Sequence, residues 1–375
     1  TGRGPAVIHL LLIDKKRTCQ KKRGIMLKSG IAMKRIQRQA HPCDLKLKTK
    51  GAEEMKKITI FLLAALLTLT GCASKPEKDG QPEQKPNETM TLTTLNGSQE
   101  MISVEVPVDP QRIAVLDMAV LDMLDNWGLG DRVVGMPKSS TVDYLKAYNE
   151  NEAIANLGTL KEVNMEALMV SEPDVIFISG RLSAQYEALS KIAPVVYLST
   201  DAQLGVVESV KQNAMKVASL FKMEEKAAEQ LQHFDSRVEA LRQAAQGKTA
   251  VIGMVTSSNF NTLGNGSRCS LIGNEIGFIN LADDVDSTHG NESSMELLVK
   301  LNPEYIFVLD RDSAINTEGA KLAEEVMNNE LTAKTLAAQQ GHIVYLTPTV
   351  WYLAEGGITA LDWMLQDLEA VLLSE

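Results

Sequence analysis

Cysteine is scarce in this chain, which has four cysteines among 375 residues. Cys19 and Cys43 lie in a basic N-terminal region and Cys72 ends an apolar segment, so only Cys269 belongs to the rest of the chain. A single cysteine cannot form an intrachain disulfide. The fold of this larger part must therefore rest on its hydrophobic core.

Histidine and catalytic sequence motifs are also scarce. Beyond residue 54 the histidines are His233, His289 and His342, and His233 falls within a helical pattern. A receptor for zinc or manganese ions needs several histidines together with carboxylates, so such a site is not expected. The chain has no GxSxG elbow, no phosphate-binding P-loop and no HExxH motif. An enzyme, the alternative from a different functional class, is therefore not expected.

Basic charge is missing from most of the chain. Residues 1–54 hold 14 Lys and Arg against 4 Asp and Glu, whereas residues 55–375 hold 24 against 44. A body with a formal net charge of −20 does not bind nucleic acid through general electrostatics. If it binds an anion, it needs a local cluster of cations.

Residues 55–71 have the pattern of a bacterial export signal. Two lysines follow Met55, and residues 58–69 are an apolar run of about a dozen residues, which is short of the roughly 20 that a membrane-spanning helix needs. The run ends in LTGC, which resembles the lipobox of bacterial lipoproteins, so we expect lipidation at Cys72. Residues 1–54 have a positive net charge, whereas the rest of the chain has a negative one. We therefore expect residues 1–54 to be a tag or an upstream read-through.

A polar segment follows the predicted lipid site. Residues 73–89 are rich in Pro, Lys, Glu and Gln and contain no large apolar residue, so they cannot bury enough surface to fold. We assign residues 72–98 to the lipidated cysteine and a flexible tether. Signal, lipid, tether and globular body together predict a protein anchored at the extracytoplasmic face of the cell membrane.

The body contains an internal repeat. Residues 165–181 read MEALMVSEPDVIFISGR and residues 295–311 read MELLVKLNPEYIFVLDR, with seven of 17 positions identical. Each copy predicts a short helix, a turn marked by proline, a buried strand and a loop that carries arginine. Because the offset of 130 residues is one domain length, the repeat predicts two homologous lobes.

Apolar segments alternate with helical patterns throughout the body. Further strands are predicted at residues 112–116, 133–135, 195–199, 250–255 and 343–347. Runs that are apolar throughout suit parallel strands covered on both faces. We therefore predict an α/β fold with two similar lobes, each around a central parallel sheet, at residues 99–203 and 247–375.

A long helical pattern without proline, residues 204–246, separates the two lobes. About 40 helical residues would span roughly 60 Å, which is long for one globular helix, so a break is expected near residues 221–223. We predict one helix that packs on the first lobe and one that joins the lobes. A helical connector is stiff and predicts a cleft between lobes that move little when ligand binds.

Two lobes, a stiff connector and a lipoprotein signal together resemble the class III periplasmic-binding-protein-like receptors of siderophore, haem and cobalamin ABC importers. Residues 110–137 resemble the first strand–helix–strand of that class. The segments SGR, GSR, THG, LDR and WYLAEG occur in this order and have counterparts in the catecholate-siderophore receptors. The resemblance covers the chain from about residue 100 to its end.

The resemblance implies a monomeric receptor without an intrinsic cofactor. Such a receptor binds an anionic ferric siderophore and delivers it to the permease of an ABC importer. Haem or another iron or cobalt chelate is the alternative ligand for the same fold.

Two arginines have the positions that such a ligand requires. Arg181 and Arg311 directly follow a predicted strand, one in each lobe, and ligands of parallel α/β sheets bind beyond the carboxyl ends of strands. The resemblance adds Arg268, in the loop LGNGSRCS. Arginine stays protonated and stacks on aromatic planes, which suits a ferric tris-catecholate with three negative charges and favours it over haem.

The resemblance implies further ligand residues. His289 and Tyr352 are expected to complete the iron shell when the siderophore supplies only four donors. Trp351, beside Tyr352, is expected at the same site, and Lys138, after the strand at 133–135, is a candidate cation.

Glu166 and Glu296 hold the same place in the two repeats. A carboxylate near the start of a helix interacts well with the helix dipole, and this alone explains their position. The resemblance implies a second role, in which one exposed glutamate per lobe docks against arginines of the permease.

Overall fold

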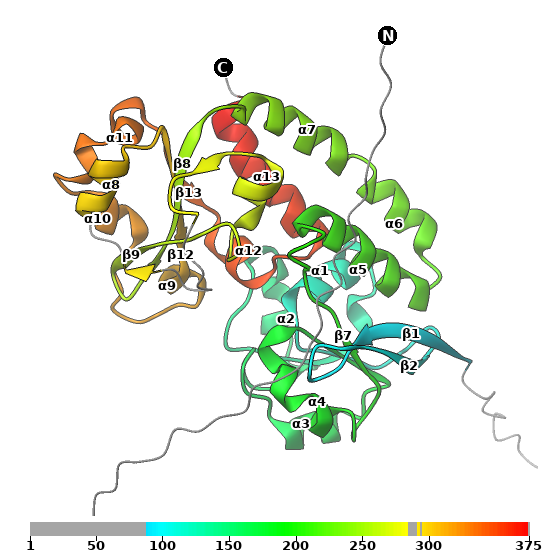
Figure 1. Ribbon diagram of the computed structural model, residues 1–375. Coiled ribbons are helices and arrows are strands. Elements are labelled where there is room, and N and C mark those ends of the chain that lie inside the picture. Colours follow the sequence, from blue (N-terminus) through cyan, green and yellow to red (C-terminus); the bar gives the residue numbers. More distant parts are fainter. Residues whose placement is uncertain (1–87, 284–290, 293–294, 374–375) are drawn as a thin grey trace, which may run out of the picture. The chain divides into compact units, whose positions relative to one another are not determined.

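The computed structural model describes residues 88–283, 291–292 and 295–373. These residues belong to one compact unit, Lys78–Glu375, in which two α/β lobes are joined by helices (Figure 1). The predicted signal, Cys72 and His289 lie outside the described residues. Among the helices that are described, none has the length and apolar character needed to cross a membrane.

The first lobe is built on a five-stranded sheet in the order β5-β4-β3-β6-β7, and every neighbouring pair is parallel. Its strands are β3 (Ile113–Val115), β4 (Val133–Met136), β5 (Ala155–Asn156), β6 (Val175–Ile178) and β7 (Val195–Tyr197). Its helices are α1 (Met118–Asn126), α2 (Lys146–Glu150), α3 (Met165–Val170) and α4 (Tyr186–Leu189), with 3-10 turns at Gly130–Arg132, Asp143–Leu145 and Gly180–Gln185. Every residue of β6 is buried, as a strand covered on both faces requires.

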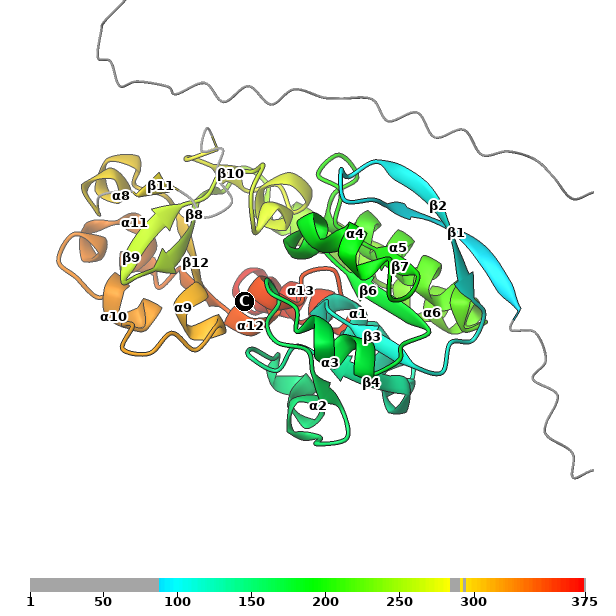
Figure 2. The same ribbon diagram turned by 90° about the horizontal axis from the view of Figure 1, so that it is seen from below.

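An antiparallel hairpin, β1 (Thr89–Leu95) and β2 (Met101–Pro107), precedes the first sheet. The hydroxyl of Thr94 donates to the carbonyl of Tyr197 at 2.7 Å and accepts from its N–H at 2.8 Å, which attaches the hairpin to β7 (Figure 2). The first lobe therefore includes residues 89–98, which the sequence assigned to the tether. The two strands have seven residues each and are only partly buried, and they directly follow the polar residues that the sequence assigned to the tether.

The second lobe contains a sheet in the order β11-β9-β8-β12-β13, with β10 also paired to β8. Its strands are β8 (Thr249–Thr256), β9 (Asn259–Thr262), β10 (Ile279–Asn280), β11 (Asn291–Glu292), β12 (Tyr305–Asp310) and β13 (Ile343–Leu346). Its helices are α8 (Met295–Leu301), α9 (Arg311–Ala314), α10 (Ala323–Met327), α11 (Leu336–Gln340), α12 (Pro348–Leu353) and α13 (Ile358–Leu372), with single turns at Leu271–Glu275 and Thr332–Lys334. The central strands β8, β12 and β13 are parallel, as predicted. Strands β9 and β11 add an antiparallel edge that the sequence analysis did not predict.

The internal repeat corresponds to two equivalent structural units. In each lobe the repeat strand, β6 or β12, lies at the centre of three parallel strands. Its acidic residue binds the neighbouring strand, because Asp174 accepts the N–H of Arg112 and Glu304 accepts that of Thr249, both at 2.8 Å. The residue before the repeat proline is left-handed in both copies, with φ of 43° and 46°. The two lobes thus share one local architecture.

The connector consists of three helices, α5 (Val206–Leu220), α6 (Glu224–Leu231) and α7 (Phe234–Ala245). The break predicted near residues 221–223 is confirmed, and Lys222 there has a left-handed φ of 56° that a right-handed helix cannot contain. A second break, between α6 and α7, was not predicted. Helices α5 and α7 both pack against α13.

The C-terminal helix α13 packs against α1 of the first lobe, although its sequence position is in the second. The fully buried carboxylate of Asp122, on α1, accepts the N–H groups of Thr359 and Ala360 at 3.0 and 2.8 Å and the hydroxyl of Tyr144 at 2.6 Å. A Cβ at Gly357 would lie 2.2 Å from this carboxylate, so only glycine fits. Asp122 therefore caps the start of α13 from the other lobe.

We predict that Asp122→Ala lowers the free energy of unfolding by about 3 kcal/mol, because it leaves buried donors without an acceptor. Urea denaturation measures this change. Asp125→Ala, on an exposed position of the same helix, is the matched control and should cost less, because it removes one solvent-exposed hydrogen bond from Tyr148. Equal small losses in both variants would contradict the assigned role of Asp122.

Candidate functional site

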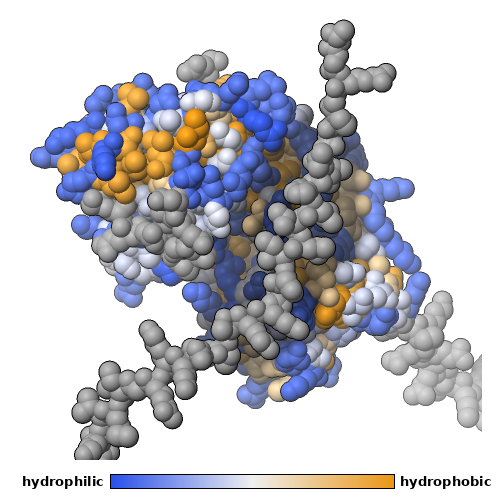
Figure 3. Space-filling view, viewed as in Figure 1, coloured by the Kyte–Doolittle hydropathy of each residue, from blue (hydrophilic) through white to orange (hydrophobic). Residues whose placement is uncertain are grey.

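A cavity of about 420 Å³ lies between the two lobes. The first lobe lines it with residues just beyond the carboxyl ends of β3, β6 and β7, which is where parallel sheets bind ligands: Asp117, Ser179, Gly180, Arg181, Leu198, Ser199 and Thr200. The other wall comes from the second half of the chain: Arg268, Tyr352, Leu353, Glu355 and Gly356. In Figure 3 the surface is hollowed between the lobes. We call this cavity the cleft.

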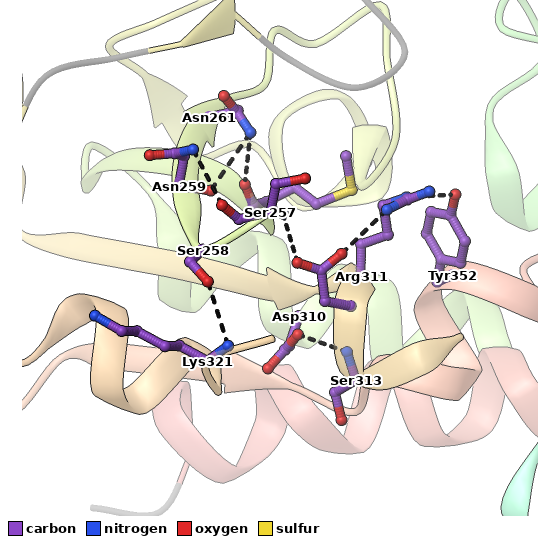
Figure 4. Close-up of polar contacts among 11 residues, drawn as sticks. Ser257, Ser258, Asn259, Asn261, Asp310, Arg311, Ser313, Lys321 and Tyr352 are labelled. Carbon is purple, nitrogen blue, oxygen red and sulfur yellow. Dashed lines mark hydrogen bonds and ion pairs between the residues drawn. The ribbon is translucent and has the colours of Figure 1, made fainter. Parts of the chain in front are cut away.

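Three arginines surround Tyr352 at the end of α12. The carbonyl oxygen of Tyr352 accepts hydrogen bonds from Arg181 at 2.8 Å and from Arg268 at 3.3 Å. Its phenol oxygen accepts from Nε of Arg311 at 3.2 Å (Figure 4). The guanidinium carbons of Arg181, Arg268 and Arg311 lie 5.9, 4.3 and 5.9 Å from the centre of the Tyr352 ring. The structure thus brings together four of the residues that the sequence singled out.

Arg311 is held by its own neighbours. Its Nη1 lies 3.1 Å from the carboxylate of Asp312, which is almost fully buried and also accepts the N–H of Ser257 at the β8–β9 turn (Figure 4). Asp310 accepts the N–H of Ser313 and so caps α9. Arg311 does not line the cleft and reaches it only through Tyr352.

Burial shifts the pKa values of three residues that line the cleft. Burial lowers the pKa of Arg181, and the charge of Arg268 lowers it further. Burial raises the pKa of Asp117 to about 6, although the positive charge of Arg181 acts in the opposite direction. Burial also raises the pKa of Glu355, with Arg268 and Arg181 opposing the change. The cleft therefore contains both positive and acidic groups.

The sequence analysis did not predict Asp117, Glu355 and Lys161, which all line the cleft. Asp117 directly follows the predicted strand 112–116, so the rule that selected Arg181 would have selected it too. Glu355 belongs to the segment WYLAEG, whose Tyr352 was chosen instead. Lys161 lies in a loop where no sequence signal marks it.

Two predicted ligand residues do not line the cleft. The ammonium group of Lys138 donates to the carbonyl of Asn151 at 2.6 Å. Trp351 is fully buried, and its indole N–H donates to Asp367 at 2.8 Å, so its ring packs in the core next to Tyr352. No placement of His289 is described. Within the described ranges, no three His, Cys, Asp or Glu side chains form a group suited to a metal ion.

Glu166 and Glu296 are both exposed, on α3 and α8. Neither carboxylate forms an ion pair with another residue that the structure describes. The two predicted docking residues are thus accessible and occupy equivalent places in the repeat.

Comparison with known proteins agrees with this geometry. Residues 113–350 match the family described as periplasmic binding protein. The chain belongs to this family. This membership confirms the predicted family and the α/β fold with parallel sheets.

Similar members of the family are named as siderophore receptors. Petrobactin-binding protein YclQ of Bacillus subtilis is 29% identical over 320 residues, which cover 84% of this chain and 98% of YclQ. Ferric-anguibactin-binding protein FatB of Vibrio anguillarum is 28% identical over 315 residues, 82% of this chain and 95% of FatB. The crystal structure of the catecholate-siderophore binding protein VctP from Vibrio cholerae matches with a TM-score of 0.69 and 29% identity, over 75% of this chain and all of VctP.

We predict that Asp117 makes stability depend on pH. Below about pH 3 its carboxyl is mostly protonated in both the folded and the unfolded chain, whose pKa values are about 6 and 3.8. As the pH rises, the unfolded carboxyl ionises first, so the free energy of unfolding falls by about 2 kcal/mol between pH 4.5 and 7. Asp117→Asn should abolish this contribution.

Chemical denaturation of both proteins at several pH values measures the contribution. Asp131→Asn, at an exposed carboxyl, is the control. A stability difference between wild type and Asp117→Asn that stays constant with pH would show that the carboxyl does not titrate in this range.

Proposed function

We propose that this periplasmic binding protein is the extracytoplasmic receptor of an ABC importer and binds an anionic ferric siderophore of the catecholate type. The observation that carries the proposal is the convergence of Arg181, Arg268 and Arg311 on Tyr352. The relatives named above, which bind petrobactin, ferric anguibactin and catecholate siderophores, support the same ligand class. They are all named as binding proteins, which supports binding without turnover.

Local charge explains how an acidic protein attracts such a ligand. A ferric tris-catecholate carries three negative charges, whereas the chain outside residues 1–54 has a net charge of −20. Screening limits long-range repulsion to about 10 Å, so the half-buried guanidinium groups in the cleft dominate at contact. Catechol rings also stack on guanidinium planes. Haem, the alternative ligand, carries less negative charge than a ferric tris-catecholate. It would therefore leave more of the positive charge of the three arginines uncompensated.

Tyr352 has a second role in this proposal. Its phenol oxygen and His289 would complete the iron shell when a siderophore supplies only four donors. Arg311 already donates a hydrogen bond to that oxygen and so fixes its position.

The proposed receptor works as a monomer and is held to the membrane by a lipid on Cys72. The lipobox-like segment LTGC and the polar residues that follow it carry this part of the proposal. In this proposal Glu166 and Glu296 contact the permease. Each is exposed on its own lobe.

We predict that Arg181→Ala and Arg268→Ala each weaken binding of a ferric tris-catecholate by about 10- to 100-fold, because a charge-assisted hydrogen bond contributes about 1.5–3 kcal/mol. Quenching of tryptophan fluorescence by the ferric ligand measures the dissociation constant, and Trp351 lies next to Tyr352. Lys226→Ala, which removes one exposed charge on α6, is the control. If only haem quenches the fluorescence, the ligand is haem and not a siderophore. Arginine variants with unchanged affinity would refute the proposed site.

We predict that replacing both Glu166 and Glu296 by Ala abolishes siderophore uptake and leaves ligand affinity intact. The physical reason is that these exposed carboxylates contact the permease and not the cleft. Uptake of radiolabelled iron by cells that carry the variant measures this effect. Replacement of Glu225 and Glu229 by Ala, two exposed glutamates on α6, is the matched control, and normal uptake by the first variant would disprove docking.

A further inference from the structure

A second cavity of about 270 Å³ adjoins the cleft. It lies between the residues that follow β7 and the glycine-rich loop after β9. The two cavities share Thr200, Arg268 and Glu355 in their walls. A ligand seated on the arginines can therefore extend into this second cavity, which we call the annex.

The annex differs from the cleft in its charge. Its wall contains the carboxylates of Asp201 and Glu355, and Arg268 is the one cationic residue among the lining residues. Ser267, Ser270 and Asn265 supply neutral polar groups. An anion in the annex would face two carboxylates, so the annex suits a positively charged group.

The opposite charges around the two cavities influence one another but form no ion pair among the described residues. Glu355 makes no hydrogen bond or ion pair with any residue that the structure describes, although Arg181 and Arg268 are near enough to influence it. Nε of Arg268 is buried and has no acceptor among the same residues. A carboxylate left unpaired in a protein costs free energy, so Glu355, in the walls of both cavities, points to a ligand that carries a cation.

A purely anionic ligand would satisfy only half of this arrangement. It would pair with Arg268 but would lie against the carboxylate of Glu355, and like charges at close range repel. A ligand with a protonated amine beside its anionic centre would compensate the charges of both Arg268 and Glu355. Opposite charges placed in adjoining cavities also favour one orientation of such a ligand.

We propose that the annex binds a protonated amine in the backbone of the siderophore, with Glu355 and Asp201 as its partners. This inference rests on the proposed function and narrows it, because the ligand becomes an amine-bearing catecholate siderophore. The arginines hold the ferric catecholate centre, and the annex selects for the ammonium group.

Two synthetic ligands test the annex. Both are ferric bis-catecholates on the same linear triamine linker, and the central nitrogen is a free, protonated amine in one and acetylated in the other. Isothermal titration at pH 7 should show that the wild-type protein binds the amine ligand about tenfold more tightly. Glu355→Gln should remove this preference by weakening the amine ligand, and the acetylated ligand should bind as before or more tightly.

Further variants separate the possible outcomes. Asp201→Asn, at an exposed side chain, should reduce the preference without affecting the fold, and Glu225→Gln on α6 should leave it unchanged. Equal affinity of the wild type for both ligands, or equal weakening of both by Glu355→Gln, would overturn the annex and leave the receptor function standing. Binding of neither ligand, together with no binding of a ferric tris-catecholate, would overturn the receptor function as well.

Discussion

The cleft depends on one buried carboxylate that crosses from the first lobe to the end of the chain. Asp122 on α1 accepts the first N–H groups of α13, and Gly357 is what allows it to approach. On the connector, Arg237 of α7 forms ion pairs with Asp362 and Glu369 of α13. Because only residues 354–357 separate α13 from α12, anchoring α13 also positions Tyr352. The centre of the arginine cluster is thus anchored to the first lobe and the connector.

Arg181 and Arg268 gather there without an ion pair to any described carboxylate, although Asp117 and Glu355 lie near enough to act on the charge of Arg181. Tyr352 lies at the C-terminal end of α12, where carbonyl oxygens lack partners within the helix and carry partial negative charge. Arg181 and Arg268 donate to such a carbonyl, which holds two like charges together even though the charge of Arg268 lowers the pKa of Arg181. Of the three guanidinium groups, only that of Arg311 pairs with a carboxylate, Asp312, among the described residues. Positive charge consequently remains for an anionic ligand.

The sequence predicted what depends on local pattern and on the repeat. Matching strands in the two copies predicted Arg181 and Arg311 at equivalent strand ends, and the break in the connector followed from helix length. The contact of Asp122 with Ala360 could not be predicted, because it joins residues 238 apart through a tight turn of the tertiary structure. The hairpin that begins at residue 89 was missed because it directly follows the polar residues 73–88 and was assigned to the tether with them. Lys138 and Trp351 had plausible positions in the sequence, but the orientation of their side chains depends on packing.

The anchoring of α13 decides which parts of the cleft can move. Arg181 and Tyr352 are both held to the first lobe, so their hydrogen bond does not require the lobes to close. Arg311 follows β12 in the sheet of the second lobe, and its bond to Tyr352 would change if that sheet rotated. Because α12 and α13 pack against β12 and β13, such rotation would disturb buried contacts. A cleft that is largely formed before the ligand arrives avoids the ordering cost of closure, which favours affinity through pre-organisation.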